Sequence, residues 1–152
     1  MTQTTREGTH SFQIVRTVKA SAEEAYAAWT DPVLMRRWFG TVVEADVRVG
    51  GQYRVENHEA DGQIYKHKGE YRVLEPGRRI VMTFTFDGDQ SGYAGLYSDE
   101  IITIQFRSLA PQLTEVTLIN SWNGKGMNDE EKQRLDEGWG DWFDRYERAL
   151  RD

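Results

Sequence analysis

The sequence predicts an α+β fold in which an antiparallel sheet is covered on one face by a long C-terminal helix. Three observations predict it. Apolar and polar residues alternate with the period of two of half-buried strands through most of residues 42–122. Apolar residues recur at helical spacing from Leu135 to Leu150. The chain of 152 residues has the length of one domain, with residues 1–9 expected to be a disordered polar tail and residues 10–152 a single domain.

The N-terminal elements are predicted to be one strand, over residues 10–18, followed by two short helices. Ser21 and Glu24 have the spacing of a capping box, in which each side chain bonds a free backbone N–H of the first helical turn. Asp31-Pro32 supplies the N-cap and the first residue of the second helix, which Gly40 is expected to end. The apolar stripe of the first helix is Ala22, Ala25, Tyr26 and Trp29.

The middle of the chain is predicted to add about six strands, which makes a sheet of about seven. The turns are Gly50-Gly51, Asp61-Gly62, Pro76-Gly77, Pro111 and a glycine-containing loop over residues 87–99. Alternation through Ala45, Val47 and Val49 predicts a strand that continues to the first of these turns. On the strand before residue 111, the residues expected to face inward begin at Ile102 and continue with Ile104 and Phe106.

The C-terminal segment is predicted to be one long amphipathic helix, begun by a second capping pair, Asn128 and Glu131. Its apolar stripe consists of Leu135, Trp139, Trp142, Phe143, Tyr146 and Leu150. An antiparallel sheet with one polar face needs an apolar cover on the other, and only this helix is long enough to provide one. A stripe wider than the core requires would instead place Trp142 and Tyr146 on a surface for a partner.

Composition excludes several classes of function. The chain contains no cysteine, which excludes disulfides, thiolate nucleophiles and cysteine-ligated metals. Its 19 basic and 25 acidic residues give a net charge of −6, which disfavours a nucleic-acid partner. No apolar run approaches the roughly 18 residues of a membrane span, and the N-terminus lacks the apolar segment of a signal peptide. We therefore expect a cytoplasmic protein, monomeric or weakly dimeric, with no membrane partner.

No metal or cofactor is expected either. His10, His58 and His67 do not have the spacing of metal ligands, and the chain contains no phosphate-binding loop or dinucleotide-binding glycine pattern. No catalytic residue is assigned from a motif.

Six short segments resemble those of a known family. They are Arg16-Thr17-Val18-Lys19-Ala20-Ser21, Trp29-Thr30-Asp31-Pro32, Arg37-Trp38-Phe39-Gly40, Asp46-Val47-Arg48-Val49-Gly50-Gly51, Lys68-Gly69-Glu70-Tyr71 and Glu137-Gly138-Trp139. In this order and spacing the chain resembles the START-like (SRPBCC) superfamily, and within it the single-domain activators of the heat-shock-protein-90 ATPase. The resemblance implies a helix-grip fold, in which a curved antiparallel sheet of about seven strands holds the long helix and a cavity lies between them. It implies no single activity, because these relatives include co-chaperones, lipid carriers, hormone receptors and polyketide cyclases.

The sequence also indicates which residues would line such a cavity. Gly138 in the long helix and Gly69 on the longest strand each remove a side chain, so both are expected to open space. The alternative is that Trp139 or another aromatic side chain fills that space. The candidate ligand-binding residues are Trp38, Tyr53, Tyr65, His67, Tyr71, Met82, Phe84, Asn120, Trp122, Trp139 and Phe143.

Three roles are open for His67: a core residue with satisfied hydrogen bonds, a group that orients a ligand, and a proton-transfer group. The same alternatives hold for Asn120. No carboxylate is assigned to the inward face, since Asp46, Glu56 and Glu70 fall on the outer face by period. A converging pair of titratable groups for acid–base catalysis is therefore not expected.

Three functions follow. The favoured one is binding of a small hydrophobic or aromatic ligand in the cavity. The second is a co-chaperone-like module that stimulates a chaperone ATPase; a single domain disfavours it, because the eukaryotic co-chaperones of this family carry an additional N-terminal domain. The third is an enzyme of the polyketide cyclase or hydrolase type, which would hold a folded substrate with few acid–base groups.

Overall fold

The computed structural model describes residues 10–58, 60–86, 97–124 and 126–151. The predicted tail, residues 1–9, and residues 87–96 of the predicted loop lie outside the described residues.

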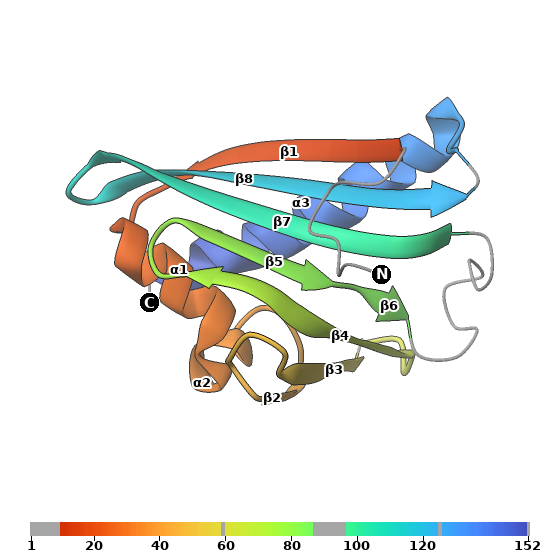
Figure 1. The fold of residues 1–152 in the computed structure, drawn as a ribbon, viewed down its shortest axis with the longest axis horizontal. Helices are drawn as coiled ribbons and strands as arrows, with labels where there is room; N and C mark the ends of the chain where they lie inside the picture. Colours follow the sequence, from red (N-terminus) through yellow and green to blue (C-terminus); the bar gives the residue numbers. More distant parts are fainter. Residues whose placement is uncertain (1–9, 59, 87–96, 125, 152) are drawn as a thin grey trace.

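An antiparallel sheet forms one layer of the molecule (Figure 1). Its strands are β1 (His10–Val18), β2 (Val42–Ala45), β3 (Gln52–His58), β4 (Ile64–Glu75), β5 (Arg79–Thr83), β6 (Thr85–Phe86), β7 (Tyr97–Ala110) and β8 (Leu113–Gly124). Seven strands pair in the order β1-β8-β7-β5-β4-β3-β2, and the short β6 pairs with β4. The sheet therefore has two edges in the described part of the chain, β1 and β2, and the predicted antiparallel sheet of about seven strands is confirmed.

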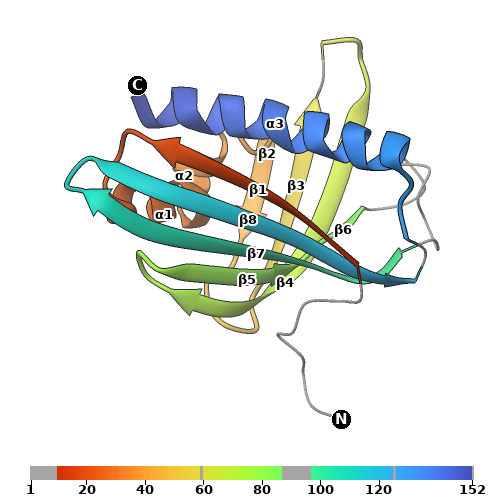
Figure 2. The same ribbon diagram turned by 90° about the horizontal axis from the view of Figure 1, so that it is seen from above.

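The sheet is curved, and β4 is the strand that joins its two parts. One part of β4 pairs with β3 and β6, and the other pairs with β5 after a register shift between Tyr71 and Val73. Such irregularities bend a strand and increase its twist. Figure 2 shows β2 and β3 turned away from the direction of β7 and β8, with the long helix lying across one face of the bent sheet.

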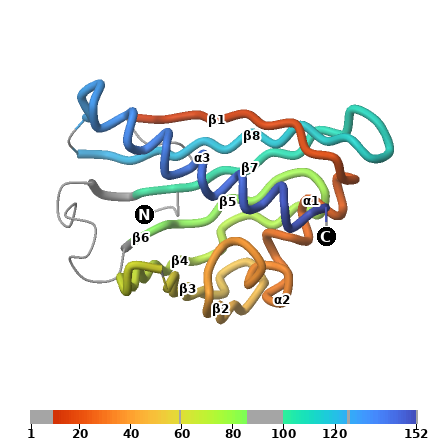
Figure 3. Tube along the Cα trace, turned by 180° about the vertical axis from the view of Figure 1, so that it is seen from behind, coloured from red at the N-terminus to blue at the C-terminus, as the bar shows by residue number. Residues whose placement is uncertain are grey.

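The helices are α1 (Ala22–Thr30), α2 (Pro32–Met35) and α3 (Asp129–Arg151). The capping box of α1 is present: the Glu24 backbone N–H donates to Ser21 Oγ at 3.1 Å, and the Ser21 N–H donates to Glu24 Oε1 at 3.0 Å. Helix α2 ends at Met35 rather than at Gly40, because residues 36–39 continue only as turns. Helix α3 crosses the sheet diagonally (Figure 3), which confirms the predicted arrangement of a long C-terminal helix on the sheet.

Two predicted strand limits were wrong. β2 ends at Ala45, and the side chains of Val47 and Val49 are exposed. The chain leaves the ladder there because Gly50, at φ 87°, and Gly51 exchange backbone hydrogen bonds with Tyr71 instead of with β3. At the other limit, β7 begins at Tyr97, so its first residues belong to the strand and not to the predicted loop.

The core lies between the sheet and the helices, and α3 enters it with its C-terminal half. Its buried side chains are Trp139, Phe143 and Tyr146. The Tyr146 hydroxyl donates to the Ala25 carbonyl oxygen at 2.7 Å, and its ring lies 4.8 Å from that of Trp38. Tyr146 is thus a core residue rather than part of a surface for a partner.

Candidate functional site

A pocket of about 290 Å³ lies between α3 and the face of the sheet that α3 crosses. Strands β3, β4, β7 and β8 and the segment between β5 and β6 line one side, and α3 with the residue before its cap lines the other. The lining residues are Asn57, Tyr65, His67, Phe84, Glu100, Asn120, Met127, Arg134, Leu135, Gly138, Trp139, Asp141, Trp142 and Arg145.

Aromatic rings from the sheet and from α3 form the apolar walls. The ring centroids of His67 and Phe84 are 4.7 Å apart, and those of Trp139 and Trp142 are 4.9 Å apart. The two groups meet where His67 lies 5.4 Å from Trp142 and Phe84 lies 5.9 Å from Trp139. These separations are those of packed aromatic pairs, so the walls are built from rings that support one another.

His67 is only 2% exposed and lies among these rings. The centroid of the Phe39 ring also lies 5.0 Å from that of His67. Burial lowers the pKa of His67 to about 3, because the charged imidazolium loses its hydration in this environment. The imidazole is therefore neutral at neutral pH. It belongs to the wall of the pocket as an uncharged ring.

A chain of hydrogen bonds forms the polar part of the pocket. The Trp139 indole N–H donates to Asn120 Oδ1 at 3.2 Å, and Asn120 Nδ2 donates to Glu100 Oε1 at 3.2 Å. An indole can only donate, so its bond fixes which way the Asn120 amide points and directs the amide N–H toward the carboxyl of Glu100. The three residues come from α3, β8 and β7, and the chain ties the helix to the sheet at the pocket.

Glu100 is the titratable group on which the electrostatics of the pocket depend. Burial raises the pKa of its carboxyl to about 7, and the hydrogen bond from Asn120 opposes that rise. Near neutral pH the carboxyl is consequently divided between its neutral and its ionised form.

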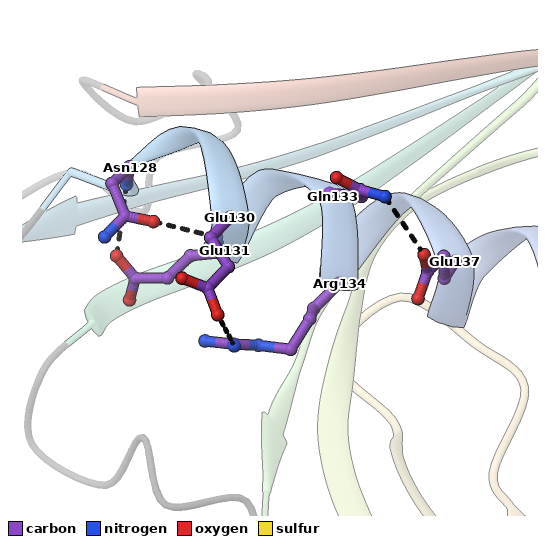
Figure 4. Close-up of polar contacts among 6 residues, drawn as sticks. All are labelled: Asn128, Glu130, Glu131, Gln133, Arg134 and Glu137. Atoms are coloured by element: carbon purple, nitrogen blue, oxygen red, sulfur yellow. Dashed lines mark hydrogen bonds and ion pairs between the residues drawn. The ribbon is translucent and has the colours of Figure 1, made fainter.

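Charged and exposed residues of α3 mark the mouth of the pocket. Arg134, Gly138 and Asp141 are exposed, and Arg145 is half-buried. Figure 4 shows the first turns of α3, where Arg134 pairs with Glu130 at 3.2 Å and the second predicted capping pair, Asn128 and Glu131, is formed. This part of the helix is thus held by its own polar contacts while it borders the opening.

The structure brings five of the eleven candidate ligand-binding residues to the pocket: Tyr65, His67, Phe84, Asn120 and Trp139. Six do not line it, and all six are buried elsewhere: Trp38, Tyr53, Tyr71, Met82, Trp122 and Phe143. The polar atoms of two of these are already used within the fold. The Trp38 indole N–H donates to the Ala28 backbone carbonyl oxygen at 2.8 Å, and the Tyr53 hydroxyl donates to the Thr83 backbone carbonyl oxygen at 2.6 Å.

Gly138 and Gly69, the two glycines that were expected to open space, differ in the room that surrounds them. A Cβ on Gly138 would meet no atom within 4 Å, and Gly138 lines the pocket. A Cβ on Gly69 would collide with the backbone carbonyl of Thr83 and approach the Tyr53 ring to 2.7 Å. Gly69 therefore serves close packing of β4 against its neighbours, and the expectation that it opens the cavity was wrong.

Sequence reasoning missed several lining residues, above all Glu100. Glu100 has the same parity as Ile102, Ile104 and Phe106, so alternation would have assigned it inward had the strand been started at its true beginning. On the helix, Arg134, Asp141 and Arg145 recur at helical spacing and form one stripe with Gly138; of these four residues only Gly138 was expected at the cavity.

Neither a metal cluster nor a membrane span is found in the described residues. No group of three or more histidine, aspartate or glutamate side chains there could hold a metal ion. None of the helices described is both long and apolar enough to cross a membrane.

Solved structures with the same fold support the assignment of this architecture. Protein CV1439 from Chromobacterium violaceum superposes with a TM-score of 0.75 at 27% sequence identity, over 93% of this chain and 97% of that one. A protein from Arthrobacter aurescens gives a TM-score of 0.75 at 20% identity, over 92% of this chain and 85% of the other. DynU16, from the dynemicin biosynthetic locus, gives 0.74 at 23% identity; 93% of this chain covers 47% of DynU16, about half its length.

A comparison with curated proteins finds no match. The family model for Activator of Hsp90 ATPase homolog 1-like proteins matches residues 19–151, which include α1, α2, all strands after β1 and the whole of α3. Together with the helix-grip arrangement of sheet and helix, this match shows that the chain belongs to the Activator of Hsp90 ATPase homolog 1-like family of the START-like superfamily.

Proposed function

We propose that this protein binds a small apolar or aromatic molecule in the pocket between α3 and the sheet. The observation that carries the proposal is the pocket itself, an opening of about 290 Å³ walled by aromatic rings and containing the hydrogen-bonded side chains of Asn120 and Glu100. Ligand sites in proteins are mostly apolar concavities with a few polar groups that fix orientation, and this volume is near the lower end of their usual range. The pocket suits a molecule of one or two rings.

Gly138 supports the proposal because packing does not require a glycine there. Glycine costs about 1 kcal/mol relative to alanine in the interior of a helix. A methyl group at this position would touch nothing within 4 Å, so no collision explains the residue. The missing side chain widens the mouth of the pocket, which gives glycine a role if molecules pass through it.

The test is a thermal-shift and calorimetric titration with two neutral aromatic probes, indole and 2-naphthol. A ligand that binds only the folded state stabilises it by RT ln(1 + [L]/Kd), or about 2.7 kcal/mol at a hundred times Kd. Gly138→Leu should remove the stabilisation by filling the mouth. Gly140→Ala is the matched control, since Gly140 is a helical glycine outside the pocket lining whose Cβ would make only an ordinary contact, 3.7 Å from Arg16.

Native mass spectrometry of the protein purified from its own host supplies the second arm. A co-purifying small molecule that Gly138→Leu loses and Gly140→Ala retains would support the proposal. Protein that carries no small molecule and that neither probe stabilises would contradict it.

The family match supports a second candidate, stimulation of a chaperone ATPase, because the family is described by that activity. The measurement is the ATPase turnover of purified Hsp90 with and without this protein. Unchanged turnover over a tenfold excess of the protein would exclude this candidate.

The position of Glu100 supports a third candidate, an acid–base reaction on a bound molecule. Glu100 and His67 line the same pocket, and their environments move their pKa values in opposite senses, up for the acid and down for the imidazole. Hydrolysis of p-nitrophenyl esters that His67→Ala and Glu100→Gln both lose, with folding intact, would support catalysis. Equal hydrolysis by wild type and both variants would contradict it.

A further inference from the structure

We infer that the molecule the pocket is built for is an apolar amine, whose protonated nitrogen binds the carboxylate of Glu100 while its apolar or aromatic body lies among the rings. The inference rests on the proposed ligand-binding function and adds the chemical class of the ligand. It follows from the hydrogen bonds, the charges and the rings of the pocket.

Among the described residues, Glu100 has acceptor capacity that no other group uses. Within the described residues its carboxyl accepts one hydrogen bond, from Asn120 Nδ2, and forms no ion pair. A carboxylate offers about four lone-pair sites. The acid is thus held in position by the fold and can accept hydrogen bonds from a molecule in the pocket.

The neighbouring polar groups cannot take over this role. Both ends of the Asn120 amide are engaged, Oδ1 by the Trp139 indole and Nδ2 by Glu100. His67 is neutral and lies between Phe84 and Trp142 as part of the ring wall. Of the groups that face the pocket from the sheet, Glu100 is the one that can carry a charge at neutral pH, and that charge is negative.

The walls favour a cation as well. Phe84, Trp139 and Trp142 present aromatic rings around the pocket, and a cation over such a ring is attracted by its quadrupole, most strongly for tryptophan. An apolar body without a donor would instead remove further water from Glu100 and gain nothing from it. An amine therefore satisfies the acid and the rings at once.

The charges at the mouth do not reverse this preference. Arg134 is paired with Glu130, and the lining stripe that carries Arg145 also carries the acid Asp141. An anionic ligand would meet Arg134 where that side chain is exposed, and ion pairs at exposed positions contribute little. In the described part of the chain, the remaining lone pairs of Glu100 would meanwhile have no partner.

The class of ligand predicts a pH dependence. Because the amine binds the ionised form of Glu100 and the carboxyl is half ionised near pH 7, the affinity should increase as the pH rises. The other titratable or charged groups facing the pocket are Tyr65, His67, Arg134, Asp141 and Arg145. The ionisation of Glu100 alone gives an expected increase of about tenfold from pH 6 to pH 8.

The experiment is isothermal titration of the full chain with three probes that share one body, 2-phenylethylamine, 2-phenylethanol and phenylacetate. At pH 8 we expect the amine to bind at least tenfold more tightly than the alcohol, and phenylacetate to bind least. Glu100→Gln should lower the amine affinity at least tenfold and leave the alcohol within threefold. Glu137→Gln, the same change at an exposed glutamate of α3 outside the pocket lining, is the matched control and should change neither by more than threefold.

The outcomes separate this inference from the proposed function. Equal binding of amine and alcohol, or an amine preference that survives Glu100→Gln, overturns the amine assignment and leaves the ligand-binding function standing. Phenylacetate as the tightest probe also overturns it, in favour of the arginines at the mouth. Failure of all three probes, together with no effect of indole or 2-naphthol, overturns both. If Glu100→Gln does not fold by circular dichroism, the tenfold pH dependence of wild type decides: a flat profile overturns the inference.

Discussion

Glu100 lies half-buried on β7 and lines the pocket together with the aromatic rings. Charging it there means removing an ion from water into a largely apolar environment, which burial opposes and a single hydrogen bond from Asn120 only partly offsets. Burying the ionised carboxyl of Glu100 therefore costs free energy of folding that an apolar leucine at the same position would not cost. Such costs are often found at functional sites.

The raised pKa of Glu100 has a consequence for stability. Between the ordinary pKa of a glutamate, near 4.5, and about 7, the folded protein holds a proton that the unfolded chain has released. The free energy of unfolding should therefore fall as the pH rises through this window, by at most about 3 kcal/mol. Urea denaturation of wild type and Glu100→Gln at pH 5, 6, 7 and 8 measures it.

The difference in the free energy of unfolding between wild type and Glu100→Gln at each pH reports the titration of Glu100 alone, because the other titrating groups are the same in both proteins. Glu100→Gln preserves the shape and an oxygen that can accept from Asn120, and it cannot ionise. We expect its stability relative to wild type to increase steadily from pH 5 to pH 8. A difference that does not change with pH would show that the carboxyl of Glu100 is as well solvated in the fold as in the unfolded chain.

On the scale of single elements, the two glycines of β4 and α3 make opposite predictions. Gly69→Ala should destabilise the protein by about 1–3 kcal/mol, because the added methyl would collide with the Thr83 backbone carbonyl and crowd the Tyr53 ring. Gly138→Ala should stabilise it by up to about 1 kcal/mol, because the helix gains a better helix former and the methyl meets open space.

Urea denaturation of both variants under the same conditions checks the pair. Each variant makes the same chemical change, glycine to alanine, so each is the control for the other when the changes in the free energy of unfolding have opposite signs. Destabilisation by Gly138→Ala would indicate that side chains move into the space beside α3 and that the pocket is smaller than described.

The elements that local signals determine were predictable. The capping pairs Ser21–Glu24 and Asn128–Glu131, the Asp31-Pro32 start of α2 and the turn glycines each act through their own neighbours in the chain. The end of β2 was not predictable in this way, because alternation through Val47 and Val49 reports side-chain type and not backbone pairing. There the pairing partner is Tyr71, on a strand that follows later in the chain.

The site was predictable only in part for a related reason. Periodicity identifies the inward face of a strand, and most of the candidate ligand-binding residues named from it are buried, but most buried residues touch other side chains and not a void. Tyr65 and His67 border the pocket while Tyr71, on the same strand and face, does not. Which of them meets open space depends on how α3 crosses a bent sheet, and that is a tertiary property.

Across the whole molecule, α3 is anchored unequally. From Trp139 onward it inserts Trp139, Phe143 and Tyr146 into the core, and Arg16 on β1 reaches Asp144 at 3.0 Å and Glu147 at 2.9 Å. Over residues 129–138 no side chain is buried, and the contacts drawn in Figure 4 are internal to the helix and its cap. The half of the helix that carries Arg134 and Gly138 at the mouth of the pocket is thus the half that the core holds least.

Amide hydrogen exchange should show this division. Amides of residues 129–138 are expected to exchange faster than those of residues 139–150, because local opening there breaks few buried contacts. Saturating 2-phenylethylamine should slow the first group more than the second, since the ligand adds contacts at the mouth. Uniform protection along α3, unaffected by the amine, would contradict a partly anchored helix.

The hydrogen bond from the Trp139 indole to Asn120 gives the protein a built-in optical reporter. An indole's emission responds to the polarisation of its N–H, and this N–H leads through one amide to the carboxyl of Glu100. A ligand that neutralises the carboxyl would therefore shift the wavelength of the protein's tryptophan emission. Occupancy could be followed without a dye, a label or advance knowledge of what the ligand is.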